Sequence, residues 1–236
     1  MSSINPRETL DRALQELLDD ILILGSMVEE AVRASVNALK QRDLSASEKI
    51  YAADDRLNEK HFEIEDRCIT LIATQQPMAK DLRTLAAVIE ISTELERMGD
   101  YAKGIAKINL LLGSEPLVKP LIDIPRMADL SIDMLHRSLG AFVARDVDAA
   151  RKIPLEDDQI DGLYNQVYRE LVTYMIADTS TIDRANFLLW AAHNLERLAD
   201  RVTNICERTI YMATGEMREL DRSDDELLHF DKKYKP

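Results

Sequence analysis

The sequence has few of the residues that interrupt helices or cross-link small domains. Seven glycines, seven prolines and two cysteines, Cys68 and Cys206, occur in 236 residues. This scarcity favours long uninterrupted helices. Both cysteines lie in apolar helical pattern and far apart, which indicates buried thiols in a reducing compartment rather than a disulfide framework. The longest apolar run, residues 187–192, is far too short to cross a bilayer. We expect a cytoplasmic protein with no signal segment and no direct membrane insertion.

Positive charge is also scarce. Thirty Lys and Arg residues face 43 Asp and Glu residues, so the formal net charge is −13. Binding to nucleic acid needs a concentrated basic patch, and an anionic membrane surface attracts basic segments, so both classes of partner are disfavoured. Apolar residues make up 46% of the chain, which is enough for a hydrophobic core.

The chain contains an internal repeat. Leu95-Glu96-Arg97-Met98-Gly99-Asp100 returns as Leu195-Glu196-Arg197-Leu198-Ala199-Asp200. Upstream, Lys49-Ile50 and Asp54-Asp55 match Lys152-Ile153 and Asp157-Asp158. The offset is 103 residues in the early part and 100 in the late part, so the first copy has three extra residues, near positions 74–77. A repeat of this length indicates one duplicated folding unit rather than a solenoid of short modules.

Each copy has the apolar periodicity of three helices. In the first copy we expect helices at about 6–42, from 45 to the turn at Pro77, and at 79–112, with a capping box at Ser45-x-x-Glu48 and Gly113 as a C-cap. In the second copy we expect 125–144, 147–177 and 182–213. The sequence therefore predicts an all-α fold of two pseudo-symmetric three-helix bundles. The predicted divisions are residues 5–113, residues 122–216, and a tail at 217–236 with a short helix from Ser223.

Carboxylates gather at one face of the predicted helices in each copy. Glu96 and Asp100 are four residues apart, as are Glu196 and Asp200. Like charges at this spacing destabilise a helix by about 0.2–0.5 kcal/mol, and a bound cation would reverse the sign of that effect. In an antiparallel hairpin, Asp200 lies level with Asp161, and Asp157 lies one turn away. The same construction in the first copy places Asp100 level with Asn58 and one turn from Asp54, so that copy has one carboxylate fewer.

Two interpretations of these carboxylates remain open. Clusters that offer only carboxylates suit hard cations such as magnesium, manganese, calcium or iron. The alternative is a solvated acidic face neutralised by nearby basic residues, namely Arg97, Lys103, Arg197 and Arg201. His193 precedes Glu196 by three residues and is either a further ligand or a surface histidine. The sequence contains no Gly-rich phosphate loop, GxSxG, HExxH or Cys–His arrangement, so no organic cofactor and no familiar catalytic template is indicated.

Several motifs resemble those of the PhoU family of phosphate-uptake regulators. They are Gln76-Pro77-x-Ala79-x-Asp81-Leu82-Arg83, Glu94-Leu95-Glu96-Arg97-Met98-Gly99-Asp100, Glu196-Arg197-x-x-Asp200-Arg201-x-Thr203-Asn204-Ile205 and Tyr211-Met212-x-Thr214-Gly215-Glu216. The resemblance extends from the first helix to about Glu216. It implies two three-helix bundles, often paired as a homodimer, and a negative regulator of phosphate uptake and phosphate-starvation signalling. Such a protein is an adaptor between the ATPase subunit of a phosphate-specific ABC transporter and a sensor histidine kinase.

The resemblance also implies metal-binding acidic motifs, which in some members hold iron or zinc clusters. Transferred residue by residue, the candidate metal ligands are Asp54, Glu96, Asp100, Asp157, Asp161, Glu196 and Asp200. Iron, zinc, manganese and magnesium are the candidate ions. Because no catalytic centre is evident, we expect an adaptor rather than an enzyme. A carboxylate-bridged metalloenzyme in a helical bundle is the alternative, and a structural helical protein without metal is the third reading.

Overall fold

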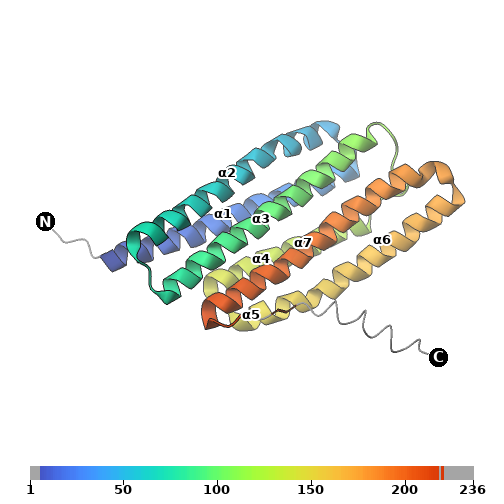
Figure 1. Ribbon diagram of the computed structural model, residues 1–236. Coiled ribbons are helices and arrows are strands. Elements are labelled where there is room, and N and C mark those ends of the chain that lie inside the picture. Colours follow the sequence, from blue (N-terminus) through green and yellow to red (C-terminus); the bar gives the residue numbers. More distant parts are fainter. Residues whose placement is uncertain (1–5, 218, 221–236) are drawn as a thin grey trace, which may run out of the picture.

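The computed structural model describes residues 6–217, 219 and 220, and this part of the chain consists of helices and their connections, with no strand (Figure 1). The first repeat has three long helices: α1 (Pro6–Gln41), α2 (Leu44–Gln75) and α3 (Ala79–Leu112). The second has α4 (Asp123–Ala144), α5 (Val147–Lys152), a 3-10 turn η1 (Ile153–Glu156), α6 (Asp157–Ala177), a second 3-10 turn η2 (Thr179–Thr181) and α7 (Ile182–Thr214). The predicted all-α fold of two bundles is confirmed.

The single helix expected at 147–177 is wrong. The chain forms α5, then the 3-10 turn, then α6, and Pro154 lies within that turn. Proline has no backbone N–H and its ring collides with the preceding helical turn, so it is tolerated only near the start of a helix. The break restarts the helix at Asp157, which places this carboxylate at the first position of α6.

The predicted capping box at Ser45 and Glu48 is also wrong. Helix α2 begins one residue earlier, and its N-cap is Asp43, whose side chain accepts a hydrogen bond from the Ala46 amide at 2.9 Å. Asp146 caps α5 in the same way in the second repeat. Aspartate is a strong N-cap residue, and it satisfies donors that would otherwise face no acceptor. The expected C-cap at Gly113 is confirmed, with φ of 55°.

The two bundles share one hydrophobic core. Helices α3 and α7 lie side by side and antiparallel, and α1 packs on α4 (Figure 1). At the second contact, a Cβ added to Gly25 would lie 2.1 Å from Leu139 Cδ1, so glycine permits the close approach of α1 to α4. None of the described helices is long and apolar enough to cross a membrane. The helix predicted from Ser223 lies outside the described residues.

Candidate functional site: an acidic cluster in each repeat

The four predicted carboxylates of the second repeat face one hollow. Asp157 and Asp161 on α6 and Glu196 and Asp200 on α7 line a pocket of 330 Å³. Its other lining residues are Arg201, Thr203 and Asn204. The two helices are joined by the short turn η2, which brings residues equally distant from that turn to the same level. The local pairing therefore follows from the hairpin, and each helix contributes two carboxylates at four-residue spacing.

The second cluster combines buried oxygens with an adjacent histidine. Oδ1 of Asp157 and Oε2 of Glu196 are shielded from solvent. His193 Nδ1 lies 2.9 Å from Glu196 Oε2, so the imidazole stands at the edge of the cluster. Burial and the nearby charge of Glu196 raise the pKa of Tyr164. Electrostatic interactions between these shielded oxygens and nearby charges are strengthened, because water screens them less.

The first cluster carries its own cation. Asp54 on α2 is only 3% exposed, and Lys103 Nζ donates to its Oδ2 at 2.6 Å. Asn58 donates to the same oxygen at 3.3 Å. This ion pair raises the pKa of Lys103 above its usual value. An ammonium group therefore already compensates the buried carboxylate of Asp54 in the first cluster.

The charged forms of the remaining acids of the first cluster, Glu96 and Asp100, are destabilised by their surroundings. Partial burial, followed by the charge of Asp100, raises the pKa of Glu96. Burial, followed by the charge of Asp54, raises the pKa of Asp100, although Lys103 opposes this rise. His61 acts in the opposite direction and partly lowers the pKa of Glu96. The ring of His61 lies against Ser92, with 3.2 Å between Nδ1 and Oγ. Raised carboxyl pKa values mean that added positive charge would stabilise this face.

The repeats differ at two positions that control the charge of the cluster. The lysine at 103 corresponds to Thr203, which lines the second pocket, and Asn58 corresponds to Asp161. The second cluster thus has one carboxylate more and lacks the lysine. Four carboxylates in a water-accessible hollow match the ligand preference of magnesium or manganese. The chemistry of the donor set therefore fits a hard cation better in the second repeat than in the first.

The basic residues expected to neutralise the acidic face behave differently from one another. Lys103 forms an ion pair with the candidate ligand Asp54. Arg97 and Arg201 both approach Glu94, at 3.5 Å each, and Arg197 lies over the ring of Tyr101. Glu94 is 7% exposed at the α3–α7 contact. Glu94 was not among the residues predicted from the sequence, although the matching position of the second repeat holds the uncharged Asn194.

The carboxylates of the two clusters are not arranged as a complete set of metal ligands in this structure. Within residues 6–217, 219 and 220, no group of three or more His, Cys, Asp or Glu side chains has an arrangement that could hold a metal ion. Binding at the second cluster would need rotation of carboxylates on the solvent side, such as that of the exposed Asp200. Metal binding by the predicted residues thus stays a prediction.

These features define the class of protein: a duplicated helical bundle with one carboxylate cluster between α2 and α3 and another between α6 and α7. The model of the PhoU domain family matches residues 21–108 and residues 124–209, one match in each repeat. The chain therefore belongs to the PhoU domain family.

Relatives and solved structures agree with this assignment. A phosphate-specific transport system accessory protein PhoU homolog from Clostridium acetobutylicum is 37% identical over 216 residues, covering 91% of this chain and 99% of the relative. The PhoU of Escherichia coli K12 is 32% identical, covering 86% of this chain and 84% of the relative. The crystal structure of the phosphate transport system regulatory protein PhoU from Streptococcus pneumoniae matches with a TM-score of 0.82 and 34% identity, covering 89% of this chain and 99% of that one. PhoU from Pseudomonas aeruginosa also gives 0.82, at 31% identity, covering 87% of this chain and 99% of that one.

Proposed function

We propose that this protein is a negative regulator of phosphate uptake and of phosphate-starvation signalling. The observation that carries the proposal is membership of the PhoU domain family in both repeats, together with relatives that are named accessory proteins of a phosphate-specific transport system. Those relatives are 32–37% identical over at least 86% of the chain. The proposed role is an adaptor without enzymatic activity, working in the cytoplasm.

An adaptor of this kind acts by binding its partners unequally in two conditions. A regulator shifts an equilibrium only by the difference in its affinity for the two states of a partner. The proposed partners are the ATPase subunit of the phosphate transporter and a sensor histidine kinase, and the proposed assembly is a homodimer. When phosphate is plentiful, the complex holds the transporter and the kinase in their low-output states.

The proposed metal ligands are those of the acidic clusters, foremost the four carboxylates of the second repeat. Asp157, Asp161, Glu196 and Asp200 already share one pocket, and Thr203 leaves there the space that a lysine takes in the first repeat. A bound cation would supply positive charge to neighbouring carboxylates and hold α6 against α7. The role is structural and electrostatic, so it would set the shape that a partner meets.

Deletion of the gene tests the regulatory proposal. Phosphate uptake and the output of phosphate-starvation genes are measured in phosphate-replete cells with the gene, without it, and with it restored on a plasmid. The proposal predicts that deletion leaves both uptake and starvation genes switched on and that the plasmid restores repression. If deletion changes neither quantity, the regulatory proposal is wrong.

Elemental analysis of tag-free protein tests the metal proposal and its rival. Asp161→Asn removes one carboxylate of the second pocket, and Asp158→Asn is the matched control because Asp158 is exposed and does not line that pocket. The proposal predicts a loss of bound metal in the first variant and not in the second. Metal together with turnover in an oxidase or phosphatase screen, abolished by Glu196→Ala, would favour the carboxylate-bridged metalloenzyme instead.

A further inference from the structure

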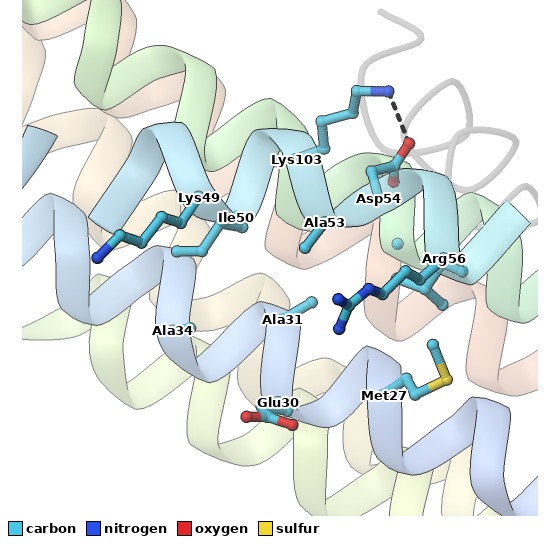
Figure 2. Close-up of a pocket in the computed structure, with 12 residues that line it drawn as sticks. Met27, Glu30, Ala31, Ala34, Lys49, Ile50, Ala53, Asp54, Arg56 and Lys103 are labelled. Carbon is cyan, nitrogen blue, oxygen red and sulfur yellow. Dashed lines mark hydrogen bonds and ion pairs between the residues drawn. The ribbon is translucent and has the colours of Figure 1, made fainter. Parts of the chain in front are cut away.

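A second kind of hollow lies in the first repeat, between α1 and α2. Its volume is 350 Å³, within the range of small-molecule sites, about 300–1,000 Å³. The lining is mostly apolar and includes Met27, Ala31 and Ala34 from α1 and Ile50, Ala53 and Leu57 from α2. Gly99 of α3 forms part of the floor, where an added Cβ would lie 3.1 Å from Leu57 Cδ1. We call this hollow the α1–α2 groove (Figure 2).

The corresponding positions of the second repeat carry charged side chains instead of alanines. Ala34 and Ala53 correspond to Arg137 and Glu156. These two form a bidentate ion pair, with Nη1 to Oε1 at 2.8 Å and Nη2 to Oε2 at 2.5 Å. Arg137 also pairs with Asp133 at 2.8 Å. The pair joins α4 to the 3-10 turn η1, and we call the Arg137–Glu156 ion pair the plug.

A third difference points the same way. Ala31 corresponds to Met134, which is only 2% exposed and fills the space that the alanine leaves open. The second repeat also has a hollow, of 630 Å³, which extends toward the turn between α4 and α5 and has the Arg137–Glu156 ion pair in its wall. In the second repeat, three larger side chains, two of them paired charges, thus stand at the positions of three alanines in the first.

The open groove is flanked by charges that lack the partners of the second repeat. Glu30 corresponds to Asp133 but faces no arginine at position 34. Within the part of the chain that the structure describes, Glu30, Lys49 and Arg56 form no ion pair. The carboxylate of Asp54 is already paired with Lys103. The rim therefore holds two cations on α2 against one carboxylate on α1.

The two cations sit at the two ends of the apolar lining. Lys49 and Arg56 are seven residues apart on α2, about 10 Å along the helix. Figure 2 shows the guanidinium of Arg56 reaching over the groove toward α1, close to Ala31 and Met27, with Lys49 at the opposite end. An apolar floor with a guanidinium at one end suits a molecule that has an apolar body and an anionic head.

We propose that the α1–α2 groove binds a small amphiphilic anion, such as a medium-chain carboxylate, with its chain on Met27, Ala31 and Ile50 and its head at Arg56. The occupant is a free molecule rather than a membrane, because the formal net charge of −13 opposes approach to an anionic lipid surface. This site lies apart from the second acidic pocket and does not depend on the proposed regulatory role.

Calorimetric titration with decanoate below its micelle concentration tests the proposal. The expected result is one binding site per chain. Arg56→Gln weakens binding about tenfold, as the loss of one charge-assisted contact implies, while the control Arg151→Gln, an exposed arginine of α5, leaves affinity unchanged. Decanol, which has the chain without the charge, binds wild type about as weakly as decanoate binds the Arg56→Gln variant.

A second pair of variants separates binding from folding. The double variant Ala34→Arg with Ala53→Glu builds the ion pair of the second repeat into the groove, so decanoate binding is lost while the helical spectrum and melting temperature are kept. The matched control, Arg137→Ala with Glu156→Ala, removes the plug of the second repeat, lowers the melting temperature and leaves decanoate affinity unchanged.

Three results would overturn the proposal. The first is the absence of decanoate binding to wild type. The second is binding that survives the plug in a folded double variant, which would place the ligand elsewhere. The third is flotation with phosphatidylglycerol vesicles that requires Arg56 while free decanoate does not bind, which would make the groove a lipid-surface contact instead.

Discussion

Lys103→Thr removes the cation of the first acidic cluster, and we expect it to lower the free energy of unfolding by about 3 kcal/mol in the presence of a chelator. Removing one partner of a buried ion pair costs about 3–5 kcal/mol, because a charge is left in a poorly solvated place. Asp54 is 3% exposed on its side chain and Lys103 is 28% exposed, so the cost falls at the lower end of that range. Asn58 also donates to Asp54, at the longer distance of 3.3 Å.

Urea unfolding measured with and without manganese tests this magnitude and its cause. Manganese should return part of the lost stability, because Lys103→Thr gives the first cluster the residue that the second cluster has at position 203. The added variant Asp54→Asn should also recover stability, since it removes the stranded charge. A cost below about 0.5 kcal/mol, typical of an exposed pair, would refute the reasoning, as would a variant that neither manganese nor Asp54→Asn restores.

Three other predictions follow from single groups. Because burial and the nearby charge of Asp100 raise the pKa of Glu96, the folded state is progressively destabilised as pH rises through that pKa. Glu96→Gln should therefore raise metal-free stability at pH 7 by about 0.2–0.5 kcal/mol in urea unfolding. Burial raises the pKa of Cys68 and Cys206 to about 12, so neither should react with Ellman's reagent at pH 8 until denaturant is added, when two thiols per chain appear. The hydrogen bond from Arg7 lowers the pKa of Asp81, so the stability from this pair should be present at neutral pH and lost as pH falls through that lowered pKa, a loss that Asp81→Asn removes from the pH profile.

The duplication is the reason that so much of the fold could be predicted. Helix periodicity gives the elements, and the offset between copies gives the hairpins without any structure. The hairpin geometry predicted that Asp157, Asp161, Glu196 and Asp200 share one pocket, because residues equally far from a turn lie opposite each other across it. Gly113 and Gly215 end α3 and α7, and Pro77 lies in the turn between α2 and α3.

The failures lie where one side chain decides between two local structures. Ser45 and Glu48 have the spacing of a capping box, but Asp43 takes the cap because its carboxylate already reaches the Ala46 amide. Pro154 was visible in the sequence, yet its effect depends on whether the chain restarts the helix at once, which packing decides. The ion pair between Asp54 and Lys103 could have been suspected from charge, but its distance and burial could not.

The acidic cluster and the α1–α2 groove of the first repeat share a wall, since both Asp54 and Lys103 line the groove. An uncompensated Asp54 carboxylate would repel an anionic ligand at that wall, so the ammonium of Lys103 both satisfies the buried acid and makes the groove compatible with an anion. Lys103→Thr should therefore weaken decanoate binding as well as lower stability. Adding Asp54→Asn should restore both, because it removes the repelling charge. Recovery of stability without recovery of decanoate affinity would show that Lys103 contacts the ligand directly rather than acting through Asp54.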